Sequence, residues 1–257
     1  MPSNTPLTDA INALTQYANE TTGASDTTLS DAVGTLVAGY GGGGGSDLVD
    51  WLSNAMTTLE RSDVITIGNQ AAKGHRITKI DLPNCTSIDT RGFEGCNQMT
   101  SASLPKCVTL GDNALRDCRL SGIVLPKCTS TGPDCFYMNG NGFTYADFGN
   151  ATDNSTLTLG TWTFENLANF ELLIIRYPVR AALQNQNVFD GTRFKNGGTG
   201  GDIYIPKSLY DHLGDGTADD YKAATNWSNI DARGTITWHA IEGSQYENYY
   251  ADGTPIE

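Results

Sequence analysis

The chain has 257 residues, of which 39% are hydrophobic and 29 are glycine, and its formal net charge is −13. This length suits one repeat array or one to two compact domains. The negative charge would repel nucleic-acid phosphates and anionic membranes, so we expect neither as a partner. No apolar run in the sequence reaches the roughly 18 residues of a membrane-spanning helix, so we expect no membrane insertion.

Residues 1–40 contain two stretches whose apolar side chains recur at helical spacing. They run from Leu7 to Ala18 and from Thr28 to Val37, with a polar turn between them. A helical hairpin of this size is too small to be stable alone. We therefore expect residues 1–40 to act as an anchoring segment that packs on another protein or on copies of itself.

A run of five glycines, Gly41 to Gly45, follows the hairpin. A phosphate-binding loop would continue with Lys and Ser or Thr, whereas here Ser46 and Asp47 follow. We predict a flexible linker over residues 41–46. Residues 47–75 are predicted to cap the next domain, with Trp51 and Leu52 as cap residues and an extra strand at residues 64–67.

One pattern is then repeated three times: two apolar residues three apart, followed by any residue, Leu-Pro, any residue and Cys. The copies begin at Ile77, Met99 and Leu120, so they recur at a nearly constant period. A fixed period of this length indicates a solenoid. Apolar positions two apart in a strand face the same side, and stacked coils bury that side together. The proline ends each strand because it donates no ladder hydrogen bond.

Weaker copies extend the array to residue 206. The stretches Phe143–Phe148 and Phe170–Ile175 keep the spacing of the apolar positions but follow at longer intervals, and Ile203–Pro206 forms a degenerate last rung. A second apolar corner is predicted between the strands at Phe93, Leu115, Phe136 and Phe164. We therefore predict a mainly β solenoid over residues 76–206.

The Leu-Pro-x-Cys repeat, together with Gly92-Phe93-Glu94-Gly95-Cys96, resembles the BspA-like leucine-rich repeats. The segment from Ile203 to Pro206, with Tyr221 to Ser228 after it, resembles the endings of such arrays. The resemblance spans about residues 76–240, although the repeats after residue 130 lose the Pro and the Cys. It implies a leucine-rich-repeat solenoid but says little about function, because function resides in sites carried by a fold.

Residues 207–257 are predicted to form a C-terminal cap and an acidic tail. We expect a helix over Tyr221–Trp227 that closes the far end, and a final strand over Thr235–Trp238. The tail from Tyr246 is predicted to be disordered or to pack on a neighbour. Gly214–Asp220 is rich in aspartate but lacks the twelve-residue calcium-loop pattern, so we expect a solvated turn there.

The six cysteines all lie within the repeats, at positions 85, 96, 107, 118, 128 and 135. Equivalent cysteines on neighbouring coils would be close enough for disulfides, but their side chains would be parallel rather than converging. No C-x-x-C pair suggests zinc. We favour buried free thiols, stacked in ladders of Cys85, Cys107 and Cys128 and of Cys96 and Cys118.

No catalytic constellation is recognisable in the sequence. The histidines His75, His212 and His239 are not spaced as a metal pair, and neither H-E-x-x-H nor G-x-S-x-G occurs. We therefore expect a non-enzymatic protein without cofactor or metal.

A binding surface is predicted on the strand positions that face away from the core. Its candidate residues are Lys79, Asp81, Ser103, Tyr145 and Asp147. Tyr145 beside Asp147 would hold a sugar by stacking and hydrogen bonding. The alternative is that these side chains only tolerate solvent, and for Leu172 and Ile174 we favour burial under the C-terminal segment.

Residues 1–40, with the linker and BspA-like repeats after them, resemble the starts of tail and fibre proteins in phages and prophages of Gram-positive bacteria. This resemblance implies a virion structural protein on the particle exterior, a fibre, spike or appendage subunit. Residues 1–40 would join other virion proteins or copies of the chain, and the solenoid would meet a host cell-surface protein or glycan. The alternative is a bacterial cell-surface or secreted BspA-like adhesin, although the N-terminus has neither the basic segment nor the apolar core of a secretory signal.

Overall fold

The computed structural model describes residues 56–194, 200–227, 230 and 235–256. The chain divides into two compact units, residues 1–56 and residues 57–257, and the description that follows concerns the second. The predicted hairpin in residues 1–40, the glycine linker 41–46 and the cap residues Trp51 and Leu52 lie outside the described residues.

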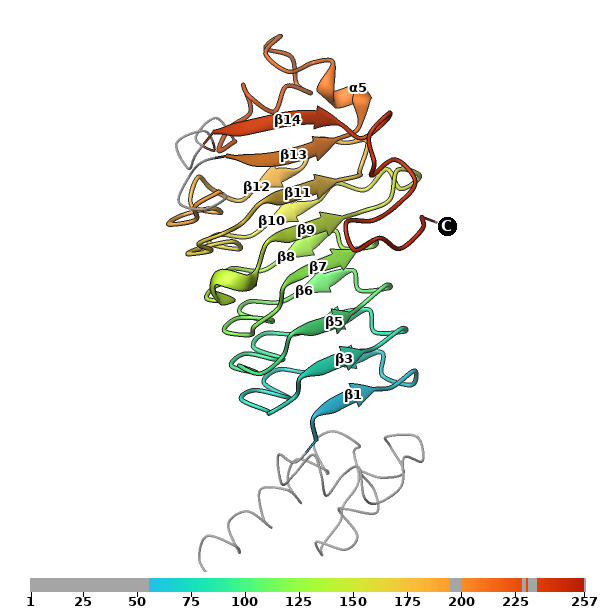
Figure 1. Ribbon diagram of the computed structural model, residues 1–257, viewed down its shortest axis with the longest axis vertical. Coiled ribbons are helices and arrows are strands. Elements are labelled where there is room, and N and C mark those ends of the chain that lie inside the picture. Colours follow the sequence, from blue (N-terminus) through green and yellow to red (C-terminus); the bar gives the residue numbers. More distant parts are fainter. Residues whose placement is uncertain (1–55, 195–199, 228–229, 231–234, 257) are drawn as a thin grey trace, which may run out of the picture. The chain divides into compact units, whose positions relative to one another are not determined.

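Residues 57–257 form a β-solenoid with two walls of parallel strands (Figure 1). The front wall consists of two sheets that follow one another: β1 (Thr58–Glu60), β3 (Lys79–Asp81) and β5 (Ser101–Ser103), then β7 (Gly122–Leu125), β9 (Tyr145–Phe148), β11 (Leu172–Ile175), β13 (Gly201–Ile205) and β14 (Ile236–Ala240). The back wall is one six-stranded sheet of β2 (Thr66–Ile67), β4 (Ser87–Ile88), β6 (Thr109–Leu110), β8 (Ser130–Thr131), β10 (Thr158–Leu159) and β12 (Ala182–Leu183). The described residues include two short helical elements, η1 (Gly140–Gly142) and α5 (Lys207–Tyr210).

The register of the front wall confirms the predicted period. Lys79 pairs with Ser101, Gly122 with Tyr145, and Tyr145 with Leu172, so within each of the two sheets a strand pairs with the equivalent strand of the next copy. The predicted limits of the array, residues 76 and 206, are too narrow. Thr58 of β1 already pairs with Lys79, and β14 extends the front wall to Ala240. These outer coils lack the Leu-Pro-x-Cys sequence, but the strands predicted at residues 64–67 and at Thr235–Trp238 are confirmed as β2 and β14.

The apolar corner predicted between the strands is confirmed. It forms a third line of contact between coils, in addition to the front and back walls. Phe93, Leu115, Phe136 and Phe164 are fully buried. Their backbone N–H groups donate to the following coil; for example, the N–H of Phe93 reaches the carbonyl of Ala114 at 2.9 Å. Each turn opens with a left-handed residue that is not glycine, namely Arg91, Asn113, Asp134 and Trp162, with φ between 56° and 61°. In this conformation, every second backbone N–H group of the turn points toward the next coil.

The interior changes character along the array. The first coils are filled with aliphatic side chains and cysteine, whereas the longer later coils are filled with stacked aromatic rings. The ring of Phe164 lies 5.0 Å from that of Phe170, 5.3 Å from that of Phe189 and 5.5 Å from that of Phe136, measured between centroids. Longer coils enclose more interior, and large side chains keep it close-packed.

All six cysteines are buried free thiols, as the ladder interpretation predicts. The Sγ atoms of Cys85, Cys107 and Cys128 each donate to the carbonyl two residues further on, at 3.2, 3.4 and 3.5 Å. Cys96 and Cys118 instead donate to carbonyls of the preceding coil. Burial raises the pKa of Cys96 to about 11 and that of Cys128 to about 12, so these thiols stay protonated at neutral pH.

The far end is closed by turns rather than by the predicted helix. Residues 221–227 form turns, and their side chains cover the edge of β12. Trp227 Nε1 donates to the carbonyl of Ala181 at 2.8 Å, Asn226 Nδ2 donates to that of Leu183 at 3.0 Å, and the hydroxyl of Tyr221 accepts the N–H of Ala181 at 2.9 Å. These polar side chains take the place of a next strand, which requires no helix.

Candidate interaction surface

The outward positions of the front wall form two columns of side chains. The first column is Thr58, Lys79, Ser101, Gly122, Tyr145, Leu172, Asp202 and Thr237, and the second is Glu60, Asp81, Ser103, Val124, Asp147, Ile174, Tyr204 and His239. Neighbours within a column belong to adjacent strands about 4.8 Å apart. The columns therefore present one continuous surface in three sections of different chemistry.

The first section, on β1, β3 and β5, is open and polar, and we call it the open section. The predicted binding residues Lys79 and Ser103 are exposed there, and Asp81 is half-buried. Lys79 Nζ lies 2.8 Å from Glu60 Oε1, and this hydrogen bond raises the pKa of Lys79. Both side chains of the pair remain about half exposed, 47% and 54%, so a partner can reach them.

The second section lies on β7, β9 and β11. In it, the side chain of Tyr145 partly serves a structural role, because it covers its register partner Gly122. A Cβ atom on Gly122 would clash with the ring of Tyr145, so the ring lies against the glycine backbone. Burial is the largest cause of the raised pKa of Tyr145, and the carboxylates of Asp252 and Asp147 add to it. One side of the ring is thus occupied, which leaves less of it for a sugar than the sequence suggests.

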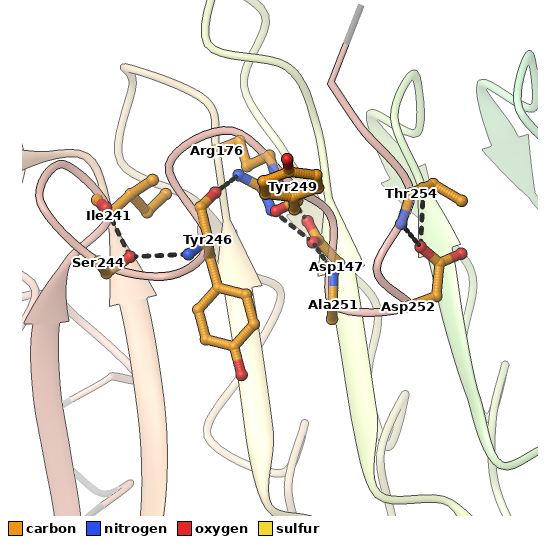
Figure 2. Close-up of polar contacts among 9 residues, drawn as sticks. All are labelled: Asp147, Arg176, Ile241, Ser244, Tyr246, Tyr249, Ala251, Asp252 and Thr254. Carbon is orange, nitrogen blue, oxygen red and sulfur yellow. Dashed lines mark hydrogen bonds and ion pairs between the residues drawn. The ribbon is translucent and has the colours of Figure 1, made fainter.

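Asp147 is not an exposed binding residue, contrary to the prediction. It is fully buried and forms a bidentate ion pair with Arg176: Nε donates to Oδ1 at 2.9 Å and Nη2 to Oδ2 at 2.8 Å (Figure 2). The N–H of Ala251 also donates to Oδ2, at 3.1 Å. Burial raises the pKa of Asp147, whereas Arg176 and the N–H of Ala251 favour its ionised form. The prediction failed because a segment that is distant in the sequence covers this position.

That covering element is the C-terminal segment, residues 242–256, which crosses the front wall from β14 back toward β9 (Figures 1 and 2). Arg176 Nη1 donates to the carbonyl of Tyr246 and Nη2 to that of Tyr249, each at 2.8 Å. The ring of Tyr250 lies 4.9 Å from the guanidinium carbon. The segment thus packs on its own solenoid rather than being disordered. Ile174, the register partner of Asp147, is fully buried and Leu172 half-buried, which agrees with burial at this section of the wall.

The third section is an aromatic cluster that sequence reasoning missed. The ring of Tyr204 stacks on His239 at 4.5 Å and meets Tyr246 edge-on at 4.9 Å, and His239 Nε2 lies 2.8 Å from Asp202 Oδ1. Tyr204 and His239 are register partners at a spacing longer than the repeat period. The only sequence signal is that each follows an apolar residue in its strand, which is too weak to align the two strands.

The chemistry available on this surface is hydrogen bonding, ion pairing and stacking. Within the described ranges, no three His, Cys, Asp or Glu side chains gather as a metal site, and no helix is long and apolar enough to cross a membrane. The buried thiols are poor nucleophiles because the reactive form is the thiolate.

Comparison with known families supports the repeat assignment. Residues 55–144 match the BspA type leucine rich repeat region, in six copies. The expected resemblance is thereby confirmed for this part of the chain. The match starts at residue 55, just before β1, which is the first strand of the solenoid. The matched region therefore includes the whole open section of the front wall.

No curated protein matches the chain. Among solved structures, a leucine-rich repeat protein from Bacteroides ovatus matches with 14% sequence identity and a TM-score of 0.24, over 72% of this chain. The match spans 58% of that protein's chain.

Proposed function

We propose that this chain is a non-enzymatic interaction module that binds a cell-surface protein or glycan through the open section of its front wall. The proposal rests on one observation: β1, β3 and β5 carry exposed side chains that do not pack in the core. Thr58, Glu60, Lys79, Ser101 and Ser103 are exposed on a rigid parallel ladder. Sites on such a scaffold are positioned more accurately than sites on loops.

The test is a charge reversal in the open section with a matched change on the back wall. The labelled full chain is screened for binding to glycan arrays and to intact bacterial cells. Lys79→Glu should weaken the binding found by about tenfold or more, because charged contacts at interfaces are sensitive to such changes. Thr109→Glu, at an exposed position of β6 on the back wall, should leave binding unchanged. Loss of binding in the back-wall variant alone would contradict the proposal.

We further propose that the module is carried on the exterior of a phage particle, with residues 1–40 as its attachment to other virion proteins. The two stretches of apolar side chains at helical spacing, and the glycine run after them in the sequence, support this context. Deletion of residues 1–45 should leave a folded solenoid that no longer joins particles. Incorporation of the shortened chain into particles would exclude this anchoring role. Recovery of the labelled chain in the cell envelope rather than in particles would favour the alternative, a bacterial surface adhesin.

A further inference from the structure

The strand β12 ends the back wall, so one of its edges pairs with β10 and the other meets no strand of the described chain. The N–H groups of Ala182 and Gln184 donate toward the coil of β10, at 2.8 and 2.9 Å. Backbone groups alternate between the two edges of a parallel strand. The N–H and C=O groups of Ala181 and Leu183 therefore face the edge that has no strand.

The cap at the far end satisfies three of these four edge groups. The carbonyl of Ala181 accepts from Trp227 Nε1, the carbonyl of Leu183 accepts from Asn226 Nδ2, and the N–H of Ala181 donates to the hydroxyl of Tyr221. Among the described residues, the N–H of Leu183 has no partner, although Leu183 is only 7% exposed. Backbone N–H groups in buried positions are seldom left unpaired, so this donor requires an acceptor from outside the chain.

A cavity of about 210 Å³ lies along the same edge of β12, and we call it the edge cavity. Its lining residues are Arg180 to Leu183 and Thr225 to Trp227. Small-molecule sites commonly measure about 300–1,000 Å³, so the edge cavity is at the small end of the scale. A water occupies about 30 Å³ of liquid volume, so there is room for about seven waters or for one small ligand.

The polar groups of the edge cavity that lack a partner are donors. The guanidinium of Arg180 and the hydroxyl of Thr225 make no hydrogen bond or ion pair within the described ranges, and the N–H of Leu183 is the third such group. The lining residues include no carboxylate. A guanidinium beside two neutral donors is a set that pairs with an oxyanion.

Charge selects among oxyanions. Arg180 is the one cation in the lining, and it balances the single charge of a carboxylate. A phosphate group carries a charge of about −1.5 to −2 at neutral pH, which would leave an excess in a chain whose net charge is already −13.

We propose that the edge cavity binds a small carboxylate. The guanidinium of Arg180 pairs with its two oxygens, and the N–H of Leu183 and the hydroxyl of Thr225 donate to them. The ligand thus supplies the acceptor that a next strand would have provided for Leu183. This site lies at the end of the back wall, so it goes beyond the proposed function, which uses the front wall, and does not depend on it.

The experiment is a titration of the isotope-labelled full chain with sodium acetate, which replaces sodium chloride at constant ionic strength. The amide signal of Leu183 is followed by NMR. It should move saturably to lower field, because the N–H gains a hydrogen bond to a charged acceptor. Phosphate, titrated in the same way, should bind more weakly than acetate.

Three variants test the contacts. Arg180→Gln removes the charge and should weaken acetate binding at least about tenfold, and Thr225→Val removes one hydroxyl and should weaken it about threefold. The matched control is Arg193→Gln, at an exposed arginine outside the edge cavity, which should leave binding unchanged. If Arg180→Gln alters the spectrum throughout the chain, Thr225→Val decides.

An amide signal that does not saturate would show that the edge cavity holds only water and would overturn the proposal. Equal affinity in the chain with Arg180→Gln, or an equal loss with Arg193→Gln, would show that Arg180 does not hold the ligand. Tighter binding of phosphate than of acetate would refute the assignment to a carboxylate.

Discussion

Truncation of Phe93 is the sharpest test of how the coils hold together. Phe93 has no exposed surface and occupies the corner between the coils that carry Ala72 and Leu115. Replacing a buried Phe with Ala costs about 3–5 kcal/mol, from lost burial and from the cavity left behind. We expect the upper half of this range, because the corner ladder fixes the backbone on both sides and hinders collapse into the space. Each coil of a solenoid contacts only its neighbours, so the loss also weakens the coupling between the two flanks.

Thermal unfolding of the full chain measures this cost, with Tyr145→Ala as the matched control. For a unit of this size, 1 kcal/mol corresponds to about 2–4 °C in the midpoint, so Phe93→Ala should lower the midpoint by about 8–20 °C. Tyr145 is half-buried over Gly122, and its truncation should cost about 1 kcal/mol and shift the midpoint by about 2–4 °C. Equal shifts for the two variants would refute the assignment of inward and outward positions along the repeat.

Two further predictions concern buried polar groups. Asn139 is 2% exposed and occupies the column of Cys96 and Cys118, where it donates to the carbonyls of Leu115 and Phe136 and accepts the N–H of Leu120. Asn139→Leu leaves these groups unpaired and should cost about 2 kcal/mol or more in urea unfolding, whereas Asn139→Cys should cost less because its thiol can still donate to the carbonyl of Leu115. The second prediction is alkaline instability: burial raises the pKa of every thiol, so the folded chain keeps protons that the unfolded chain loses above about pH 8.5. Stability should be complete below that pH and fall as pH rises toward 11, by up to about 1.4 kcal/mol per pH unit for each thiol. The urea midpoint at pH 7, 9 and 10 measures this, and a flat profile, or alkylation of the native chain at pH 8, would contradict burial of the thiols.

The period of the sequence determined the fold because each coil is built from contacts that the chain repeats locally. The apolar positions at Ile77, Met99 and Leu120 and the corner at Phe93 are all fully buried, and the strand pairing follows their spacing. The same alternation showed which strand positions face outward. For this reason Lys79 and Ser103 were correctly predicted to be exposed.

The tertiary structure alone decided what happens to those outward positions. Asp147 is buried because two groups that lie far from it in the sequence, the side chain of Arg176 and the backbone of Ala251, converge on it. Tyr204 and His239 meet across a long, irregular connection. Turns close the far end where the sequence favours a helix, because the edge of β12 needs hydrogen-bond donors and acceptors in place of a next strand. A repeat period encodes contacts between adjacent coils, whereas the path of the C-terminal segment depends on contacts made once, between groups that no local pattern relates.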